Sequence, residues 1–132
     1  MICALDSNIV SYMLKEDIDV ITRYRQAFAN GDDFVIPPIV FYEIQRGLLA
    51  RNLTKKLSKF NDLCQIAVQV EFNKSVWQEA SRIYAALSRE GRLIDDSDIL
   101  IAAFCLVNDY ALVTNNTRHF KNIECLNLIN WK

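Results

Sequence analysis

Three acidic side chains flank apolar runs in this chain of 132 residues, and their type and placement suit metal chemistry. Asp6 directly follows the run Ile2–Leu5, and Asp98 opens the run Ile99–Val107. Glu43 lies one helical turn beyond a third apolar run and two consecutive prolines. If these runs are neighbouring elements of one sheet, three carboxylates meet at one edge, where like charges repel unless protons or cations compensate them. A hard divalent cation is the simplest compensation, so the pattern predicts a metal-dependent hydrolase.

The elements that must position these acids alternate between strand-like and helix-like patterns. Short apolar runs predict strands at Ile2–Leu5, Phe34–Ile36, Ile66–Val70, Ala111–Val113 and Cys125–Ile129. Longer segments with apolar residues at helical spacing predict helices over residues 8–14, 20–29, 38–50, 54–63, 75–89 and 97–108. This alternation predicts an α/β fold in which residues 1–132 form one domain, with a central, mostly parallel sheet of about five short strands and helices on both faces.

The functional crevice of such a sheet lies beyond the carboxyl ends of its strands. Asp6 comes after the first expected strand, Glu43 comes after the second, and Thr114–Asn116 follow a later one. Asp98 joins them only if the N-terminus of its helix reaches the same edge. Each acid alone also has a purely structural interpretation, because turns and helix N-termini favour carboxylates and an amphipathic helix exposes them.

The composition is that of an ordinary globular chain. Its 52% hydrophobic and 23% charged residues argue against disorder, and its longest apolar run is far too short to span a membrane. An acid at position 6 interrupts the N-terminus before the apolar segment of a signal peptide can form. The four cysteines are scattered beside apolar residues without a C-x-x-C pair, which is typical of buried thiols in a reducing compartment. We therefore expect a cytoplasmic protein without a membrane segment.

Positive charge gathers in one segment, although the net charge of the chain is only −1. No acid occurs from Ile44 to Asn61, whereas the basic residues of this segment are Arg46, Arg51, Lys55, Lys56 and Lys59. A basic segment beside an acidic, cation-binding site would suit a polyanionic substrate held for cleavage. The same charges would also suit a solvated helix face.

Four segments around the acids resemble the ordered motifs of a known family. The segments are MICALDSNI (1–9), VFYEIQRG (40–47), GRLIDDSDILIAA (91–103) and LVTNNTRHF (112–120). In this order they resemble the motifs of PIN-domain ribonucleases, specifically the VapC-type toxins of bacterial toxin–antitoxin pairs. Each motif alone is weakly specific, but the four together span almost the whole chain.

The resemblance implies an endoribonuclease that depends on Mg²⁺ or Mn²⁺ and cleaves RNA, with tRNA among its targets, by means of a metal-activated water. Carried over to this chain, it makes Asp6 and Asp98 the principal metal ligands and catalytic residues. Glu43 would complete the acidic cluster, as a ligand or through water. Carboxylate oxygens suit Mg²⁺, which keeps several waters for substrate and nucleophile. No protein nucleophile is implied.

One departure from the family pattern concerns a fourth acid that many members carry. The corresponding positions here are Asn116 and His119, so no carboxylate is available there. Asn116 and Thr114 could still contact metal water or phosphate, and Asp95 could point into the same pocket, so these three are candidates for surrounding the metal or holding a second one. His119 would either lie at the edge of the site or serve the structure. The expected centre is therefore a three-carboxylate site for one firmly held cation.

Three further residues are candidates for RNA binding. Ser7 and Asn8 follow Asp6 directly and could orient its carboxylate or bind phosphate through backbone N–H groups. Arg46 lies three residues after Glu43 on the same expected helix and could meet a phosphate. The resemblance also implies a homodimer and a small VapB-like antitoxin whose C-terminal segment covers the active site.

Other enzyme classes fit the sequence less well. A phosphatase of the haloacid-dehalogenase type needs a second aspartate two residues after the first, where this chain has Asn8. A receiver-type phosphoacceptor needs an aspartate after its third strand, where only Glu71 is found. No glycine-rich nucleotide-binding loop occurs. The remaining alternative is a PIN-like module that binds RNA or a partner protein while cleaving poorly, and the missing fourth acid favours it.

Overall fold

The structure is a computed structural model that describes residues 1–132, in which short strands alternate with helices. The strands are β1 (Ile2–Leu5), β2 (Asp33–Val35), β3 (Ala111–Val113) and β4 (Leu128–Ile129). The helices are α1 (Ser7–Leu14), α2 (Ile18–Ala29), α3 (Pro38–Ala50), α4 (Thr54–Ile66), α5 (Lys74–Arg89), α6 (Asp96–Asn108) and α7 (Thr117–Phe120).

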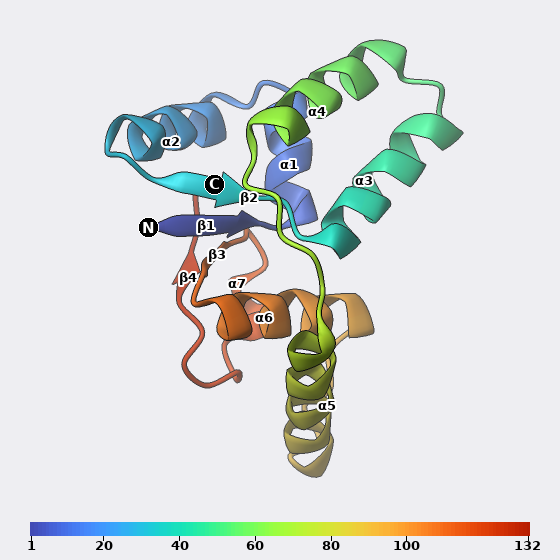
Figure 1. The fold of residues 1–132 in the computed structure, drawn as a ribbon, viewed down its shortest axis with the longest axis vertical. Coiled ribbons are helices and arrows are strands. Elements are labelled where there is room, and N and C mark those ends of the chain that lie inside the picture. Colours follow the sequence, from blue (N-terminus) through green and yellow to red (C-terminus); the bar gives the residue numbers. More distant parts are fainter.

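The four strands form one parallel sheet in the order β2–β1–β3–β4. The central strand β1 aligns Cys3 with Phe34 on one side and with Ala111 on the other. Helices α1 and α2 lie on one face of the sheet, and α6 lies on the other, with α5 packed against α6 (Figure 1). The predicted α/β class, with a parallel sheet between helical layers, is confirmed; the sheet has four strands where about five were expected.

The carboxyl edge of the sheet is framed by helix ends. After β2, Pro37 and Pro38 start α3, since proline suits the first positions of a helix, and α3 and α4 then form a hairpin beyond this edge (Figure 1). Helix α6 runs opposite to the strands, so its N-terminus returns to the same edge (Figure 1). This direction fulfils the condition on which the expected placement of Asp98 depended.

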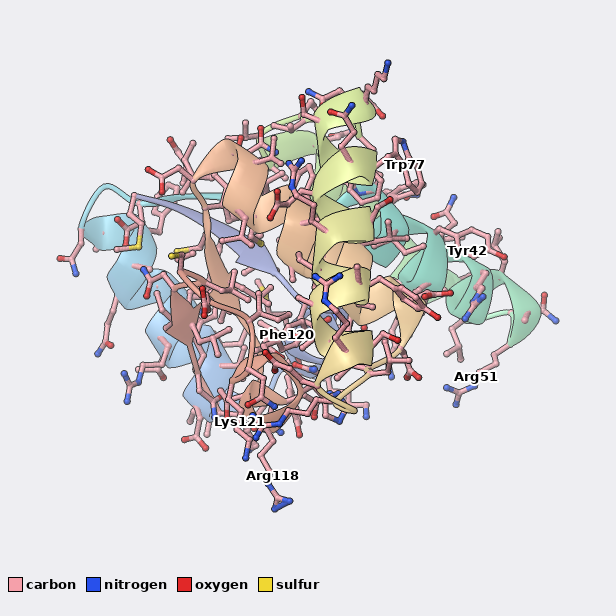
Figure 2. The ribbon with its side chains drawn as sticks, turned by 90° about the horizontal axis from the view of Figure 1, so that it is seen from below. Tyr42, Arg51, Trp77, Arg118, Phe120 and Lys121 are labelled. Atoms are coloured by element: carbon pink, nitrogen blue, oxygen red, sulfur yellow. The ribbon has the colours of Figure 1, made fainter.

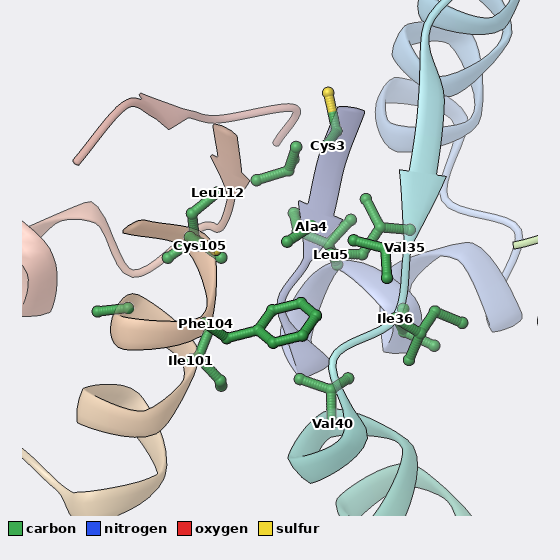
Figure 3. Packing of buried hydrophobic residues seen from close by; sticks show 14 of the residues in the cluster. Cys3, Ala4, Leu5, Val35, Ile36, Val40, Ile101, Phe104, Cys105 and Leu112 are labelled. Atoms are coloured by element: carbon green, nitrogen blue, oxygen red, sulfur yellow. The ribbon is translucent and has the colours of Figure 1, made fainter. Parts of the chain in front are cut away.

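The core is one cluster of buried apolar residues between the sheet and its helices. Phe104 of α6 is fully buried and points toward Leu5 and Ile36, which joins α6 to the central strand (Figure 3). Only two polar residues in the chain are buried, Asp6 and Thr114. Buried polar groups need hydrogen-bond partners, so these two mark a place where the interior serves something other than packing.

Two expected strands differ from the structure. Helix α4 continues to Ile66, because the helical spacing of its apolar residues extends beyond the predicted end, and only Val68 then bridges Val35 in parallel fashion. The last expected strand is limited to β4, since the chain before it turns at Cys125, which has a φ of 66°. Helix α7 was not predicted, because its four residues are too few to show a periodicity.

The cysteines also differ from expectation at one position. Cys3 and Cys105 are buried and Cys64 is half-buried, but Cys125 is exposed in the turn before β4. The prediction of buried thiols is therefore wrong for Cys125. All four thiols are free. No helix of the protein is both long and apolar enough to cross a membrane.

Candidate active site

Asp6 lies where β1 ends and caps the N-terminus of α1. Its Oδ1 accepts a hydrogen bond from the Ser7 N–H at 2.8 Å, and its Oδ2 accepts from the Thr114 hydroxyl at 2.7 Å and from Asn8 Nδ2 at 3.2 Å. The Asp6 N–H donates to the carbonyl of Val113 at 3.0 Å, which fixes the residue against β3. Three donors therefore hold the carboxylate of a residue that is only 3% exposed.

Side chains of Asn8 and Thr114 join the loop after β3 to the start of α1. The fully buried Thr114 hydroxyl donates to Asp6 and accepts from the Asn116 N–H at 3.0 Å. Asn8 Nδ2 also approaches Thr114 Oγ1 at 3.4 Å, while Asn8 Oδ1 accepts from the Asn115 N–H at 3.0 Å. Each residue thus uses both its donor and its acceptor, and the position of Asp6 is set by two loops at once.

Asp98 faces the same edge from the first turn of α6. Its side chain is 15% exposed, and its Oδ2 lies 3.0 Å from Nδ1 of His119 on α7. Burial raises the pKa of the Asp98 carboxyl, the hydrogen bond from His119 opposes that rise, and the charges of Asp6 and Asp95 add to it. His119, which is half-exposed, therefore supplies a donor to Asp98 at the position where a fourth acid was sought.

Glu43 approaches the site from α3 and is half-buried. Burial raises the pKa of its carboxyl, the neighbouring Asp6 and Asp98 charges raise it further, and Arg46 lowers it. Glu43 Oε1 is buried without a hydrogen-bond partner, a state that only Gln45 Oε1 shares among the side chains. An unpaired buried polar atom costs about 1–3 kcal/mol. A group that contacted Glu43 Oε1 would therefore stabilise the site.

These residues fit a hard divalent cation by their chemistry. The charges of Asp6 and Asp98 raise the pKa of Glu43, and the charge of Asp6 raises that of Asp98, yet no three His, Cys, Asp or Glu side chains converge on one point. Mutual repulsion favours such separation, and a cation between them would remove the repulsion and give Glu43 Oε1 its missing partner. An all-oxygen donor set is the kind that Mg²⁺ and Mn²⁺ prefer.

The fold and this geometry can be compared with known proteins. A family model described as the PIN domain matches residues 3–124, which is most of the chain. The chain belongs to the PIN-domain family. The four motifs that suggested this family in the sequence all lie within or across the matched range, and the suggested recognition is confirmed.

Relatives of this PIN domain carry VapC names. Ribonuclease VapC2 of Rickettsia felis is 28% identical over 132 residues, covering 99% of this chain and 98% of that protein. Ribonuclease VapC1 of Methanocaldococcus jannaschii is 30% identical over 107 residues, covering 81% and 75%. The crystal structure of VapBC2 from Rickettsia felis, bound to a DNA fragment from their promoter, contains a chain that matches with a TM-score of 0.91 and 27% identity over the full length of both chains.

The PIN domain places the remaining predicted residues around the site, but not all of them are free to bind. The Ser7 N–H already donates to Asp6, so it is not available to a phosphate. Arg46 is exposed and lies over the Tyr42 ring at 4.9 Å, close enough to Glu43 to lower the pKa of its carboxyl. Asp95 is exposed at the N-cap of α6 and makes no capping bond.

Two contacts in the site were missed by sequence reasoning. Asn8 was considered only beside Asp6, whereas it also binds the loop after β3 through Asn115. For His119 the sequence permits two roles and does not predict the contact with Asp98. The partners are separated by 107 and 21 positions, so no local pattern could have revealed either contact. Asn116 is exposed in that loop, and its N–H is bound by Thr114.

Proposed function

We propose that this protein is a metal-dependent endoribonuclease that acts as the toxin of a toxin–antitoxin pair. One observation carries the proposal: in a PIN domain, Asp6, Glu43 and Asp98 gather at the carboxyl edge of the sheet, and Glu43 Oε1 is buried without a partner. The names of the relatives, which are ribonucleases, support the class of reaction.

The residues have distinct roles in this proposal. Asp6, Asp98 and Glu43 would hold Mg²⁺ or Mn²⁺, which when bound supplies an activated water and neutralises charge on a phosphodiester. Thr114 and Asn8 keep the Asp6 carboxylate in one orientation through their hydrogen bonds. His119 orients Asp98 in the same way. No serine, cysteine or histidine is needed as a nucleophile.

The proposal is tested by RNA cleavage with purified protein and Mg²⁺ or Mn²⁺. We expect Asp6→Asn and Asp98→Asn each to lower the rate by at least about 100-fold, since removing about 3 kcal/mol of transition-state stabilisation costs two powers of ten. Asp96→Asn is the matched control, because Asp96 is an exposed aspartate in the same turn of α6. Equal RNA loss with wild type and both site variants would show that the nuclease proposal is wrong and favour a binding module.

A second readout does not depend on cleavage. Calorimetric titration of Mn²⁺ should give binding to wild type and to Asp96→Asn, and much weaker binding to Asp6→Asn and Glu43→Gln. A chelator should abolish cleavage by wild type and lower its melting temperature relative to the Mn²⁺-loaded protein, since a ligand that binds only the folded state stabilises it. Unchanged Mn²⁺ affinity in the variants would exclude these carboxylates as the metal site.

The substrate and partners follow from the same family resemblance. We propose tRNA as the first substrate to test, a VapB-like antitoxin as the inhibitor, and a homodimer as the assembly. The naming of the similar Rickettsia felis structure as VapBC2 supports the antitoxin. Tyr42 on α3 and Trp77 on α5 lie exposed at the surface, where partner chains would find apolar area (Figure 2). Co-purification with the product of an adjacent gene, and loss of cleavage in that complex, would test the pairing.

We further propose that residues 1–132 form one PIN domain. The family match ends at residue 124, but β4 extends the sheet beyond it and Trp131 packs in the same core. A single cooperative unfolding transition, coincident by circular dichroism and by tryptophan fluorescence, is the expected result.

A further inference from the structure

A groove of about 170 Å³ lies where the ends of α1 and α3 meet the start of α4. Its lining includes three basic side chains, Lys15, Arg51 and Lys56. Its only acidic lining residue is Glu43, which also belongs to the candidate active site. The groove is therefore continuous with the carboxylates through a shared side chain.

The three cations of the groove form no ion pair within the chain. None of Lys15, Arg51 and Lys56 takes part in an ion pair, whereas Lys59, about one turn after Lys56 on α4, pairs with Glu16 at 3.0 Å. Figure 2 shows Arg51 extending from the end of α3 into solvent. Unpaired cations around one small groove create a positive potential that favours an anionic ligand.

The N-terminus of α4 lacks the acidic and capping side chains that stabilise most helix N-termini. Its first turn contains Lys55 and Lys56 and no acid, and its N-cap, Leu53, makes no side-chain capping bond. Cations at a helix N-terminus oppose the macrodipole, at a typical cost of about 0.3–1 kcal/mol each. Lys15 and Arg51 follow helix C-termini, where a cation is favourable, so among the three groove cations only Lys56 is disfavoured by the helix on which it lies. Departures of this kind concentrate at functional sites.

Gly47 is a second departure in the wall of the same groove. It lies inside α3, one turn after Glu43, where glycine costs about 1 kcal/mol relative to alanine. Apart from the helix itself, no atom lies within 4 Å of the place where a Cβ would stand. Packing therefore does not require glycine here, but the missing side chain keeps the groove open beside the carboxylates.

We propose that this groove binds the phosphodiester backbone of the RNA strand next to the cleaved bond, with Lys15, Arg51 and Lys56 contacting its phosphates. The proposal rests on the ribonuclease function proposed above and gives the path by which the substrate reaches Glu43. Charge favours this occupant, since three basic side chains against one carboxylate in the lining suit the repeated negative charges of a phosphodiester backbone.

The test measures RNA binding without cleavage. A fluorescent oligouridine of about 12 nucleotides is titrated with protein in a chelator, over a series of salt concentrations. Each of Lys15→Ala, Arg51→Ala and Lys56→Ala should weaken binding about fivefold at about 0.1 M salt, and flatten the slope of log K against log salt by about 0.7, the value for one phosphate contact on a single strand.

Lys55→Ala is the matched control. Lys55 precedes Lys56 on α4 and is exposed, but it does not line the groove and makes no ion pair. Its loss changes the net charge by the same amount, so binding should stay within about twofold of wild type. Equal weakening by Lys55→Ala and Lys56→Ala would mean that only the general charge of the segment matters, and the groove proposal would be overturned.

Gly47→Gln separates binding from stability. Glutamine is a better helix former than glycine, so the melting temperature should rise or stay unchanged, while the longer side chain fills the groove and weakens RNA binding at least about fivefold. RNA binding equal to wild type in this variant would overturn the proposal. A structural role of Gly47 would instead lower the melting temperature, which also counts against it.

Failure of the groove proposal can be distinguished from failure of the ribonuclease proposal. If wild type cleaves RNA in Mn²⁺ but the three groove variants bind and cleave normally, the groove proposal fails and the enzyme stands. If wild type binds through the groove but does not cleave in either metal, the RNA contact stands and the enzyme proposal fails. If an oligoglutamate peptide depends on the three cations for binding and RNA does not, the groove serves an acidic protein partner and the proposal is wrong.

Discussion

At the scale of single residues, Asp6 and Thr114 form the one side-chain hydrogen bond between two buried residues. The Thr114 hydroxyl donates to Asp6 Oδ2 at 2.7 Å, accepts from the Asn116 N–H at 3.0 Å, and is fully buried. In a site with low water access such a bond is strong, and losing one partner leaves the other unsatisfied. Thr114 is therefore a positioning residue that acts through the Asp6 carboxylate.

We expect Thr114→Val to keep the shape of the side chain and to lower kcat/KM for RNA by about 10- to 100-fold, because a hydrogen bond to a charged group contributes about 1.5–3 kcal/mol. Mn²⁺ affinity, measured by calorimetry, should fall in parallel, which a purely structural role would not cause. Thr114→Ser is the control and should retain both properties. Wild-type cleavage and metal affinity in Thr114→Val would contradict the assignment.

The acids of the site could be predicted from their types and positions, but the groups that orient them could not. Asp6, Glu43 and Asp98 each lie beside an apolar run or one helical turn beyond it, and this relation is visible in the sequence alone. The contacts of Asn8 with Asn115 and of His119 with Asp98 depend on which loops come together in space. Only the parallel order of β1 and β3 brings the first pair into reach.

At the scale of elements, periodicity predicted the long helices well and failed where segments were short. All six expected helices and the strands β1, β2 and β3 occur close to their expected positions, because each buries apolar residues in the core. The expected strand at Ile66–Val70 is reduced to one bridge at Val68, since the sheet offers it only the edge of β2. A short apolar run is equally compatible with a strand that pairs in the sheet and with the continuation of a helix.

The start of α5 rests on a cap at Asn73, and the helix begins at Lys74, one residue before the expected start at Ser75. Asn73 Oδ1 accepts from the Val76 N–H at 3.2 Å, in the extended backbone typical of an N-cap. We expect Asn73→Ala to lower the free energy of unfolding by about 1 kcal/mol and the melting temperature by about 3–5 °C. Urea unfolding followed by circular dichroism measures the change. Asn73→Ser should behave like wild type, and equal losses in the two variants would argue against capping.

At the scale of the whole molecule, basic and acidic side chains gather in different regions, although the net charge is only −1. The acid-free segment from 44 to 61 supplies two of the groove cations, and Lys15 at the end of α1 supplies the third. The carboxylates stand at the neighbouring edge of the sheet and share Glu43 with the groove. An RNA strand would thus contact the basic side chains of the groove before it reached the carboxylates. The basic side chains would attract its phosphates, and the carboxylates would remain available to bind the metal ion.

The four thiols differ in how deeply they are buried, and this difference provides a test of the packing of the whole domain. Cys125 is exposed in the turn before β4, whereas Cys3 lies in β1 and Cys105 in α6, both inside the core. Burial raises the pKa of the Cys3 and Cys64 thiols, and it raises the pKa of Cys105 far above its usual range. Only a thiolate reacts readily with a disulfide reagent, so burial should suppress the reaction in two ways.

We expect one thiol to react rapidly with an aromatic disulfide reagent near pH 8, where an ordinary cysteine is partly ionised. Cys125→Ser should abolish this fast phase and leave the melting temperature unchanged. Cys64, with its raised pKa, should react more slowly and gain rate as the pH increases, because its thiolate forms only at higher pH. Cys3 and Cys105 should react only at the rate of global unfolding, and all four should react at once in denaturant. Rapid modification of Cys105 in the folded protein would show that α6 does not pack against the sheet as described, and would remove the support on which the placement of Asp98 depends.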